Sequence, residues 1–212
     1  PFYDTWAIFE LSTGVTENLM FSYQDTHCNH ISVAQYNLNG LDIENHKDKN
    51  KKIIFKKIDA LSFVSKTKIT FDLILIKQTI HLLKKKQAMK LLSICKNKLN
   101  SNGKIIILSL DPKKNEIPTF SLMKKKLKIS LHKDERLFNL IFKNKTKMIV
   151  KKFTYKVQIL KIKYLQMIRN RYISTLLNFT NEQIKAGIIE IKNDYGNILK
   201  FKDRLICFIL KK

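Results

Sequence analysis

Two continuous apolar runs in the middle of the chain limit its fold more than any other feature. They are Phe71–Lys77 (FDLILIK) and Lys104–Leu110 (KIIILSL), each of strand length. Uninterrupted apolar strands are typical of a sheet that is covered on both faces. Between them, Ala88–Leu99 has an apolar stripe at helical spacing, and Asn100–Gly103 supplies a helix stop. Strand, helix and strand with short connections predict a parallel sheet in an α/β fold.

The rest of the chain continues this alternation of elements. Further strands are expected at Leu38–Ile43, Ile53–Asp59, Lys152–Ile159 and Leu199–Leu210, and further helices at Thr119–Phe142, Tyr164–Leu177 and Asn181–Asp194. Thr180 and Gln183 have the spacing of a capping box at the start of the last helix. Because no linker separates these elements, one domain is predicted over residues 1–212.

Composition excludes some classes of protein. The chain carries 41 Lys and Arg against 17 Asp and Glu, a formal net charge of +24, and 44% of its residues are apolar. That apolar fraction is too high for a disordered chain. Only four of the basic residues are arginine, and a lysine excess is a weak signal of nucleic-acid recognition. The chain is rich in Lys, Ile, Asn and Phe and poor in Gly, Pro and Arg, which fits an AT-rich gene. The excess of basic residues can come from this gene composition or from selection for an anionic partner, and both explanations stay open.

The sequence also bears on the expected location of the protein. No apolar run approaches the roughly 18 residues of a membrane helix, and the first residues show no basic-then-apolar secretion pattern. Three scattered cysteines are too few for a disulfide framework, so the expected location is the reducing cytoplasm.

The order of elements from about Asn37 to Leu210 resembles a class I S-adenosylmethionine-dependent methyltransferase of the small-molecule type. The sequence Gly40-Leu41-Asp42-Ile43 is similar to the end of that family's second strand, and Lys57-Ile58-Asp59-Ala60 to the end of its third. Phe71–Gln78 followed by Ile80–Leu83 looks like the fourth strand and its turn. Leu99–Ile105 resembles the junction before the fifth strand, and Ile168–Arg204 the family's C-terminal part.

The resemblance implies a Rossmann-like, mostly parallel seven-stranded sheet with helices on both faces and an antiparallel last strand. Residues 160–196 would form a helical cap before that strand, and residues 1–36 an N-terminal segment. The implied cofactor is S-adenosylmethionine, held by Glu10, Gly14, Asp42, Ile43, Asp59, Ala60 and Lys77. Acids at the tips of parallel strands lie at the sheet edge where such folds bind ligands, and there a carboxylate can accept bonds from ribose hydroxyls.

The implied reaction is methyl transfer to a small, anionic molecule. Gln78, Arg169 and Arg171 are the candidate substrate contacts, since a guanidinium can pair with a substrate carboxylate. His81 is a candidate general base, because imidazole titrates near neutral pH. Packing or capping roles for His81, and a structural ion pair for the arginines, are the competing interpretations.

The main departure from the family concerns its first strand, which normally ends in acid-x-Gly-x-Gly-x-Gly. The closest segment is Glu10–Thr16, which keeps the acid and Gly14 but has Ser12 and Thr16 in place of the other glycines. In a second alignment, Tyr3–Glu10 is instead the helix that precedes the first strand. Both alignments leave a non-catalytic binding protein as an alternative to the enzyme, and an RNA-modifying methyltransferase is the third hypothesis.

Other constellations carry less weight. His27-Cys28-Asn29-His30 has no second ligand pair downstream, so no metal site is expected. The chain has neither a nucleophile elbow nor a phosphate loop, which disfavours hydrolases and nucleotide triphosphatases. No membrane partner is expected, and nucleic acid is not favoured.

Overall fold

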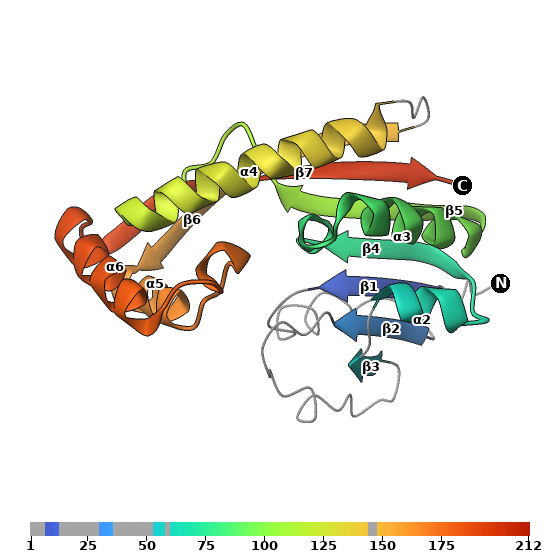
Figure 1. Cartoon of the computed structure of the whole chain (residues 1–212), viewed down its shortest axis with the longest axis horizontal. Helices are drawn as coiled ribbons and strands as arrows, with labels where there is room; N and C mark the ends of the chain where they lie inside the picture. Colours follow the sequence, from blue (N-terminus) through green and yellow to red (C-terminus); the bar gives the residue numbers. More distant parts are fainter. Residues whose placement is uncertain (1–6, 13–29, 36–52, 58–59, 144–147) are drawn as a thin grey trace. The chain divides into compact units, whose positions relative to one another are not determined.

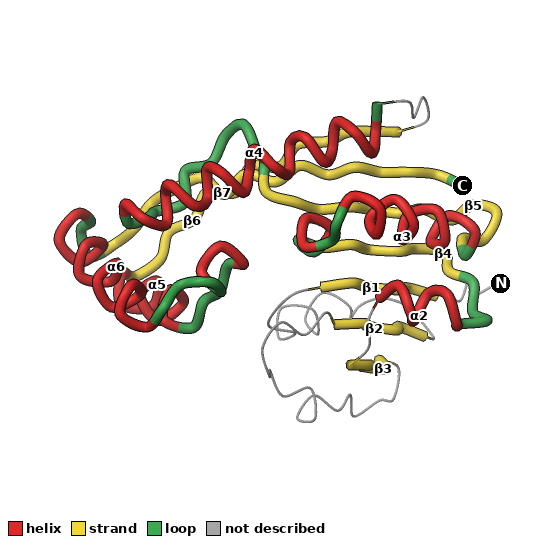
Figure 2. Tube along the Cα trace, viewed as in Figure 1, coloured by secondary structure: helices red, strands yellow, loops and turns green. Residues whose placement is uncertain are grey.

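A computed structural model of the chain describes residues 7–12, 30–35, 53–57, 60–143 and 148–212. The strands are β1 (Ala7–Ser12), β2 (His30–Gln35), β3 (Ile53–Lys57), β4 (Phe71–Lys77), β5 (Leu99–Leu110), β6 (Met148–Leu160) and β7 (Ile198–Lys211). The helices are α2 (Ala60–Lys66), α3 (Lys85–Asn97), α4 (Ser121–Phe142), α5 (Lys161–Arg169) and α6 (Asn181–Asp194), with short 3-10 turns η1 (Ile80–Leu82) and η2 (Ser174–Leu176) (Figures 1 and 2).

The packing divides the chain into two compact units. The first contains Pro1–Ser109, Ile141–Lys151 and Cys207–Lys212, and the second contains Leu110–Leu140 and Lys152–Ile206. The prediction of one domain over the whole chain stays a prediction.

In the first unit, five strands are paired in parallel in the order β3-β2-β1-β4-β5. The continuous apolar run Phe71–Lys77 forms β4 over its whole predicted length, and Phe71, Ile74 and Ile76 are fully buried. The neighbouring α3 contributes Leu91, Leu92 and Cys95 to the same core, and it packs against α2. The predicted α/β, Rossmann-like class is confirmed.

The full strand order is β3-β2-β1-β4-β5-β7-β6. Two backbone hydrogen bonds give the direction of β7 against β5. Lys212 N donates to Gly103 O at 3.3 Å within the first unit, and Asp111 N donates to Arg204 O at 2.8 Å within the second. Residue numbers rise along one strand as they fall along the other, so β7 is antiparallel to β5.

The start of β5 corrects one prediction. Asn100–Gly103 is not a helix-ending turn, because α3 ends at Asn97 and these residues belong to β5. Phe71 pairs with Leu99 but Leu73 pairs with Lys104, so β5 carries extra residues at this point. A Cβ on Gly103 would lie 2.9 Å from the Phe71 carbonyl oxygen, and glycine is therefore required by the close approach of the two strands.

The second unit has its own apolar core. It gathers Phe120 and Met123 from the start of α4 with residues of α5 and α6, namely Tyr164, Leu165, Ile168, Ile184, Ile188 and Ile191. The predicted helix Asn181–Asp194 is confirmed, and so is its capping box, in which Gln183 N donates to Thr180 Oγ1 at 3.3 Å. In the sequence, α5 and α6 lie between β6 and β7, where a helical cap was expected.

The predicted helix Tyr164–Leu177 is wrong in its second half. The helix α5 ends at Arg169, and Arg171 has a φ of 53°, which a helix cannot accommodate. None of the described helices is long and apolar enough to cross a membrane.

Candidate active site

The carboxyl ends of four neighbouring parallel strands lie in one register. Ser12 at the end of β1 pairs with Gln35 of β2 on one side and with Lys77 of β4 on the other, and Gln35 pairs in turn with Lys57 of β3. The strands therefore end at a common edge of the sheet.

The direction in which the chain adds strands to the sheet reverses between β1 and β4. From β1 the chain proceeds to β2 and β3 on one side, and later to β4 and β5 on the other. Parallel α/β sheets bind their ligands outside the carboxyl ends of the strands at such a reversal. The ends of β1 and β4, represented by the paired residues Ser12 and Lys77, are thus the expected centre of a binding site.

The structure decides between the two alignments of the N-terminal segment. Glu10 lies within β1 and pairs with Val33 and Leu75 of the strands on either side. Ala7–Glu10 is therefore a strand in the middle of the sheet, and the alignment that makes it a preceding helix is wrong. The segment Glu10–Thr16 begins in β1, and Gly14 follows two residues beyond Ser12, outside the described residues.

Several predicted cofactor residues also fall outside the described residues. They are Asp42, Ile43 and Asp59, and the whole predicted strand Leu38–Ile43 lies outside the described residues as well. The described strand beside β1 is His30–Gln35, which ends before Asp42 is reached. Ala60 is the first residue of α2 and is 1% exposed.

The turn after β4 has an unusual backbone. Gln78 follows directly on Lys77 and has a φ of 51°, in the left-handed region that residues with a Cβ rarely occupy. Its N–H donates to Leu108 O of β5 at 2.8 Å, which holds the turn against the neighbouring strand. The next residue, Thr79, is 2% exposed. Strained backbone of this kind is concentrated at functional sites, and it was not visible in the sequence.

His81 lies in η1, one short turn beyond β4. Burial lowers the pKa of His81 to about 4, so its imidazole is neutral at physiological pH. A neutral imidazole can accept a proton or a hydrogen bond, but a base with this pKa is a weak one.

The two predicted substrate arginines lie in the second unit and differ in their contacts. Arg169 is exposed at the end of α5. Arg171 donates through Nη2 to Phe179 O at 2.8 Å and to Asn181 Oδ1 at 3.1 Å, and so ties its loop to the start of α6. These hydrogen bonds support the structural interpretation of Arg171, although with a carbonyl and an amide rather than the ion pair expected.

Among the described residues, no group of three His, Cys, Asp or Glu side chains could hold a metal ion. In the sequence cluster around Cys28, His30 is the first residue of β2, and His27 lies outside the described residues.

No protein-family model matches the chain, and no curated protein sequence matches it. Solved structures do. The plantazolicin methyltransferase BpumL, in complex with a pentazolic desmethylPZN analogue and SAH, has a TM-score of 0.53 at 15% identity, covering 98% of this chain and 77% of that chain. A proposed methyltransferase from an antibiotic biosynthesis pathway of Anabaena variabilis has a TM-score of 0.63 at 11% identity, covering 96% and 90%.

The chain has the class I methyltransferase fold. A phosphoethanolamine N-methyltransferase of Haemonchus contortus, in complex with phosphomonomethylethanolamine and S-adenosylhomocysteine, also matches, with a TM-score of 0.54 at 14% identity over all of this chain and 50% of that one. At the reversal between β1 and β4, the register pairs Ser12, two residues after Glu10, with Lys77, the residue before Gln78. Gln35 and Lys57 end the next two strands at the same edge, and Gln35 was not singled out in the sequence.

Proposed function

We propose that this protein is an S-adenosylmethionine-dependent methyltransferase that acts on a small, anionic molecule. The observation that carries the proposal is the reversal point between β1 and β4, where Ser12 and Lys77 are paired. The acid-containing segment Glu10–Thr16 starts in β1, and the strained Gln78 follows β4 at the same edge. We infer in addition that the ordered strands form the complete seven-stranded sheet of this fold, with β7 antiparallel.

The resemblance to the family assigns acids and a glycine to the proposed cofactor. A carboxylate can accept hydrogen bonds from the ribose hydroxyls, and folds of this kind bind ligands at the carboxyl ends of their strands. The proposed cofactor contacts are Glu10, Gly14, Asp42, Ile43, Asp59, Ala60 and Lys77. S-adenosylmethionine supplies an activated methyl group on a sulfonium, and the task of the protein is to align the acceptor with it.

For the acceptor, we propose a contact from Gln78, while the assignment of Arg169 and Arg171 to the acceptor stays a prediction from the sequence. His81 is proposed to hold the acceptor through its neutral imidazole, and the lowered pKa fits an acceptor that needs little help in losing a proton. The formal net charge of +24 favours an anionic acceptor through the overall field of the protein.

Calorimetric titration with S-adenosylhomocysteine and S-adenosylmethionine tests the proposal. We expect binding to the native chain, and a loss of about tenfold or more in Glu10→Gln, because a charge-assisted hydrogen bond contributes about 1.5–3 kcal/mol. Asp72→Asn is the matched control. Asp72 is an acid of β4 near its amino end, where Oδ1 accepts from Asn100 Nδ2 at 2.7 Å, so the variant should bind normally. Absence of binding to the native chain would refute the proposal.

A non-catalytic binding protein is the second candidate. Ser12 and Thr16 stand where the family has glycine, and this departure favours a methyltransferase-like chain whose altered segment no longer holds the cofactor. For this candidate we expect neither S-adenosylmethionine nor S-adenosylhomocysteine to bind to the native chain, even at millimolar concentration.

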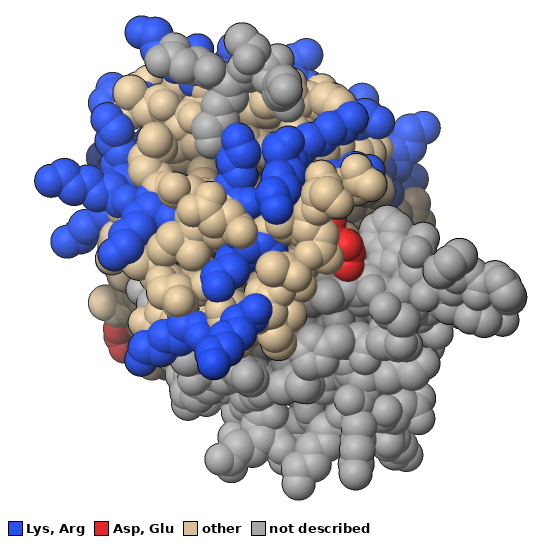
Figure 3. All heavy atoms as spheres, turned by 90° about the vertical axis from the view of Figure 1, so that its right-hand side faces the viewer, with Lys and Arg blue, Asp and Glu red and all other residues tan. Residues whose placement is uncertain are grey.

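An RNA-modifying enzyme is less well supported. Lys and Arg side chains are spread over the face shown in Figure 3 and are interrupted by other residues. RNA binding through phosphates would weaken steeply with salt, with a slope of about −0.7 per phosphate contacted on a single strand. RNA affinity with such a slope would favour this candidate over the small-molecule enzyme.

A further inference from the structure

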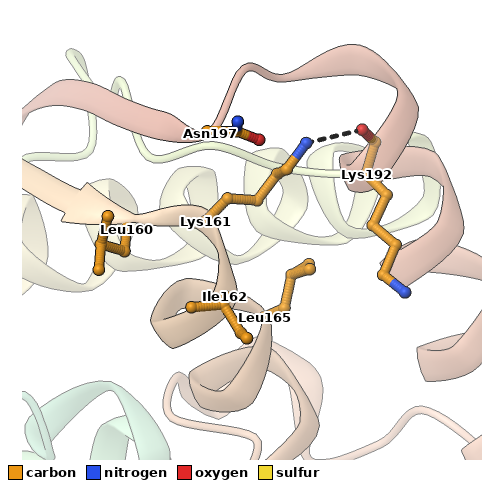
Figure 4. Close-up of a pocket in the computed structure, with 6 residues that line it drawn as sticks. All are labelled: Leu160, Lys161, Ile162, Leu165, Lys192 and Asn197. Carbon is orange, nitrogen blue, oxygen red and sulfur yellow. Dashed lines mark hydrogen bonds between the residues drawn. The ribbon is translucent and has the colours of Figure 1, made fainter.

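A pocket of about 460 Å³ lies within the second unit. It is lined by Leu160, Lys161, Ile162, Leu165, Lys192 and Asn197. These residues come from the end of β6, the first turns of α5, the last turn of α6 and the residue just before β7 (Figure 4). Its volume is within the range of 300–1,000 Å³ that is usual for sites of small molecules.

Lys161 makes one wall of the pocket rigid. Its Nζ donates to the carbonyl oxygens of Lys192 at 3.0 Å and Tyr195 at 2.7 Å, and the first of these bonds is drawn in Figure 4. Its backbone N–H donates to Asn197 O at 2.8 Å. The start of α5 is thereby tied to the end of α6 and to the segment that enters β7. A wall held in this way is formed before any ligand arrives.

The floor and rim of the pocket are apolar and partly open to water. Leu165 is 7% exposed and belongs to the core of the second unit, whereas Leu160 is 51% exposed and Ile162 is 75% exposed. Large apolar side chains that remain this exposed in a concave site gain from being covered by an apolar ligand. The pocket therefore fits a hydrocarbon chain or ring.

The charges around the pocket are all of one sign. Its two ionisable residues are Lys161 and Lys192, and no acid is among the lining residues. The Lys161 ammonium is bonded to the two carbonyl oxygens. The Lys192 ammonium lies apart from it in Figure 4, and the described residues provide it with no hydrogen bond or ion pair. It is thus available to an anionic group of a ligand.

We propose that this pocket binds an amphipathic anion, with its apolar chain against Leu160, Ile162 and Leu165 and its carboxylate at Lys192. The proposal does not depend on the methyl-transfer function, because none of the lining residues belongs to the proposed cofactor or acceptor contacts. Failure of one proposal leaves the other standing.

Decanoate at a concentration below micelle formation is the probe, and its binding to the full chain is measured by calorimetry. Lys192→Gln should weaken binding about fivefold, which is the effect of a partly exposed ion pair. Ile162→Asp should weaken it more than about tenfold, because it removes apolar contact and adds repulsion toward the carboxylate. Ile162 is so exposed that this variant should fold normally.

Two variants of α6 serve as matched controls. Lys185→Gln removes a lysine of the same helix, and Ile189→Asp alters an apolar side chain that is 59% exposed, yet neither residue lines the pocket. Both should bind decanoate like the native chain. The proposal is overturned if decanoate does not bind, or if the controls lose as much affinity as the pocket variants. It is also overturned if decanol binds as tightly as decanoate and Lys192→Gln leaves that affinity unchanged.

Discussion

Replacing Gly187 with alanine should destabilise the protein, although helix propensity alone predicts the opposite. Gly187 lies in the middle of α6, where glycine is less favourable than alanine by about 0.8–1 kcal/mol. A Cβ at this position would lie 2.5 Å from Cδ1 and 2.6 Å from Cε1 and Cγ of Phe120. Real Cβ atoms do not approach other atoms so closely, so the ring or the helix must move.

The ring of Phe120 has little room to move. It is 1% exposed and belongs to the core of the second unit, and its centroid lies 5.7 Å from that of Phe179. Ordinary contact begins near 3.4 Å, so a displacement of nearly 1 Å is needed. Forcing an extra carbon into a packed core costs about 1–3 kcal/mol. The overlap with the ring is severe, so the upper part of that range applies, and against a propensity gain of about 0.8–1 kcal/mol the free energy of unfolding of Gly187→Ala should fall by about 1–2 kcal/mol.

Urea unfolding followed by circular dichroism measures this change. Gly196→Ala is the matched control, because a Cβ on Gly196 meets no atom within 4 Å. This variant should be as stable as the native chain or slightly more stable, since alanine restricts the unfolded state. A Gly187→Ala protein as stable as the native chain would refute the close packing of α6 on Phe120.

Three further predictions follow from buried ionisable groups. Burial tends to raise the pKa of Asp111, but hydrogen bonds from Lys113 N and Lys152 outweigh this effect, and the pKa is lowered. Stability should therefore be lost as the pH falls below 3.8, the ordinary value. Acid unfolding of Asp111→Asn should show a smaller loss. Burial raises the pKa of Cys95 to about 12 and also raises that of Cys207. Mass spectrometry after iodoacetamide treatment at pH 8 should therefore find both thiols unlabelled in the folded protein, and labelling of either one would contradict the prediction. Because the pKa of His81 is lowered to about 4 from 6.5, stability should fall between pH 6.5 and 4 as the unfolded chain takes up the proton, and an NMR titration with an inflection near 6.5 would show the prediction to be wrong.

The elements that were predicted accurately are those in which local pattern and packing agree. Phe71–Lys77 is mostly apolar because no residue of β4 is exposed, and its predicted bounds are confirmed. Asn181–Asp194 starts at a capping box and buries Ile184, Ile188 and Ile191 at helical spacing, so both its start and its end could be predicted from the sequence. In each case the short-range signal and the final environment favour the same structure.

The errors occur where long-range contacts decide the local structure. Leu99–Gly103 has the composition of a turn, yet pairing with Phe71 draws it into β5. The apolar periodicity of Tyr164–Leu177 continues past the end of α5, but Arg171 adopts a positive φ and bonds to Phe179 O, so the chain leaves the helix there. Neither the strand partner nor the hydrogen-bond acceptor is near in sequence, and no local pattern could have revealed them.

The same reasoning changes the significance of the missing glycines in the proposed site. Glycine is required where φ is positive or where a backbone approaches closely, and an extended strand residue does not need its freedom. Ser12 is the last residue of β1 and pairs on both sides, with Gln35 and Lys77, so its backbone is that of an ordinary strand. A side chain at position 12 therefore costs the backbone nothing. For Ser12, the departure from glycine therefore bears only on how closely a cofactor can approach its backbone.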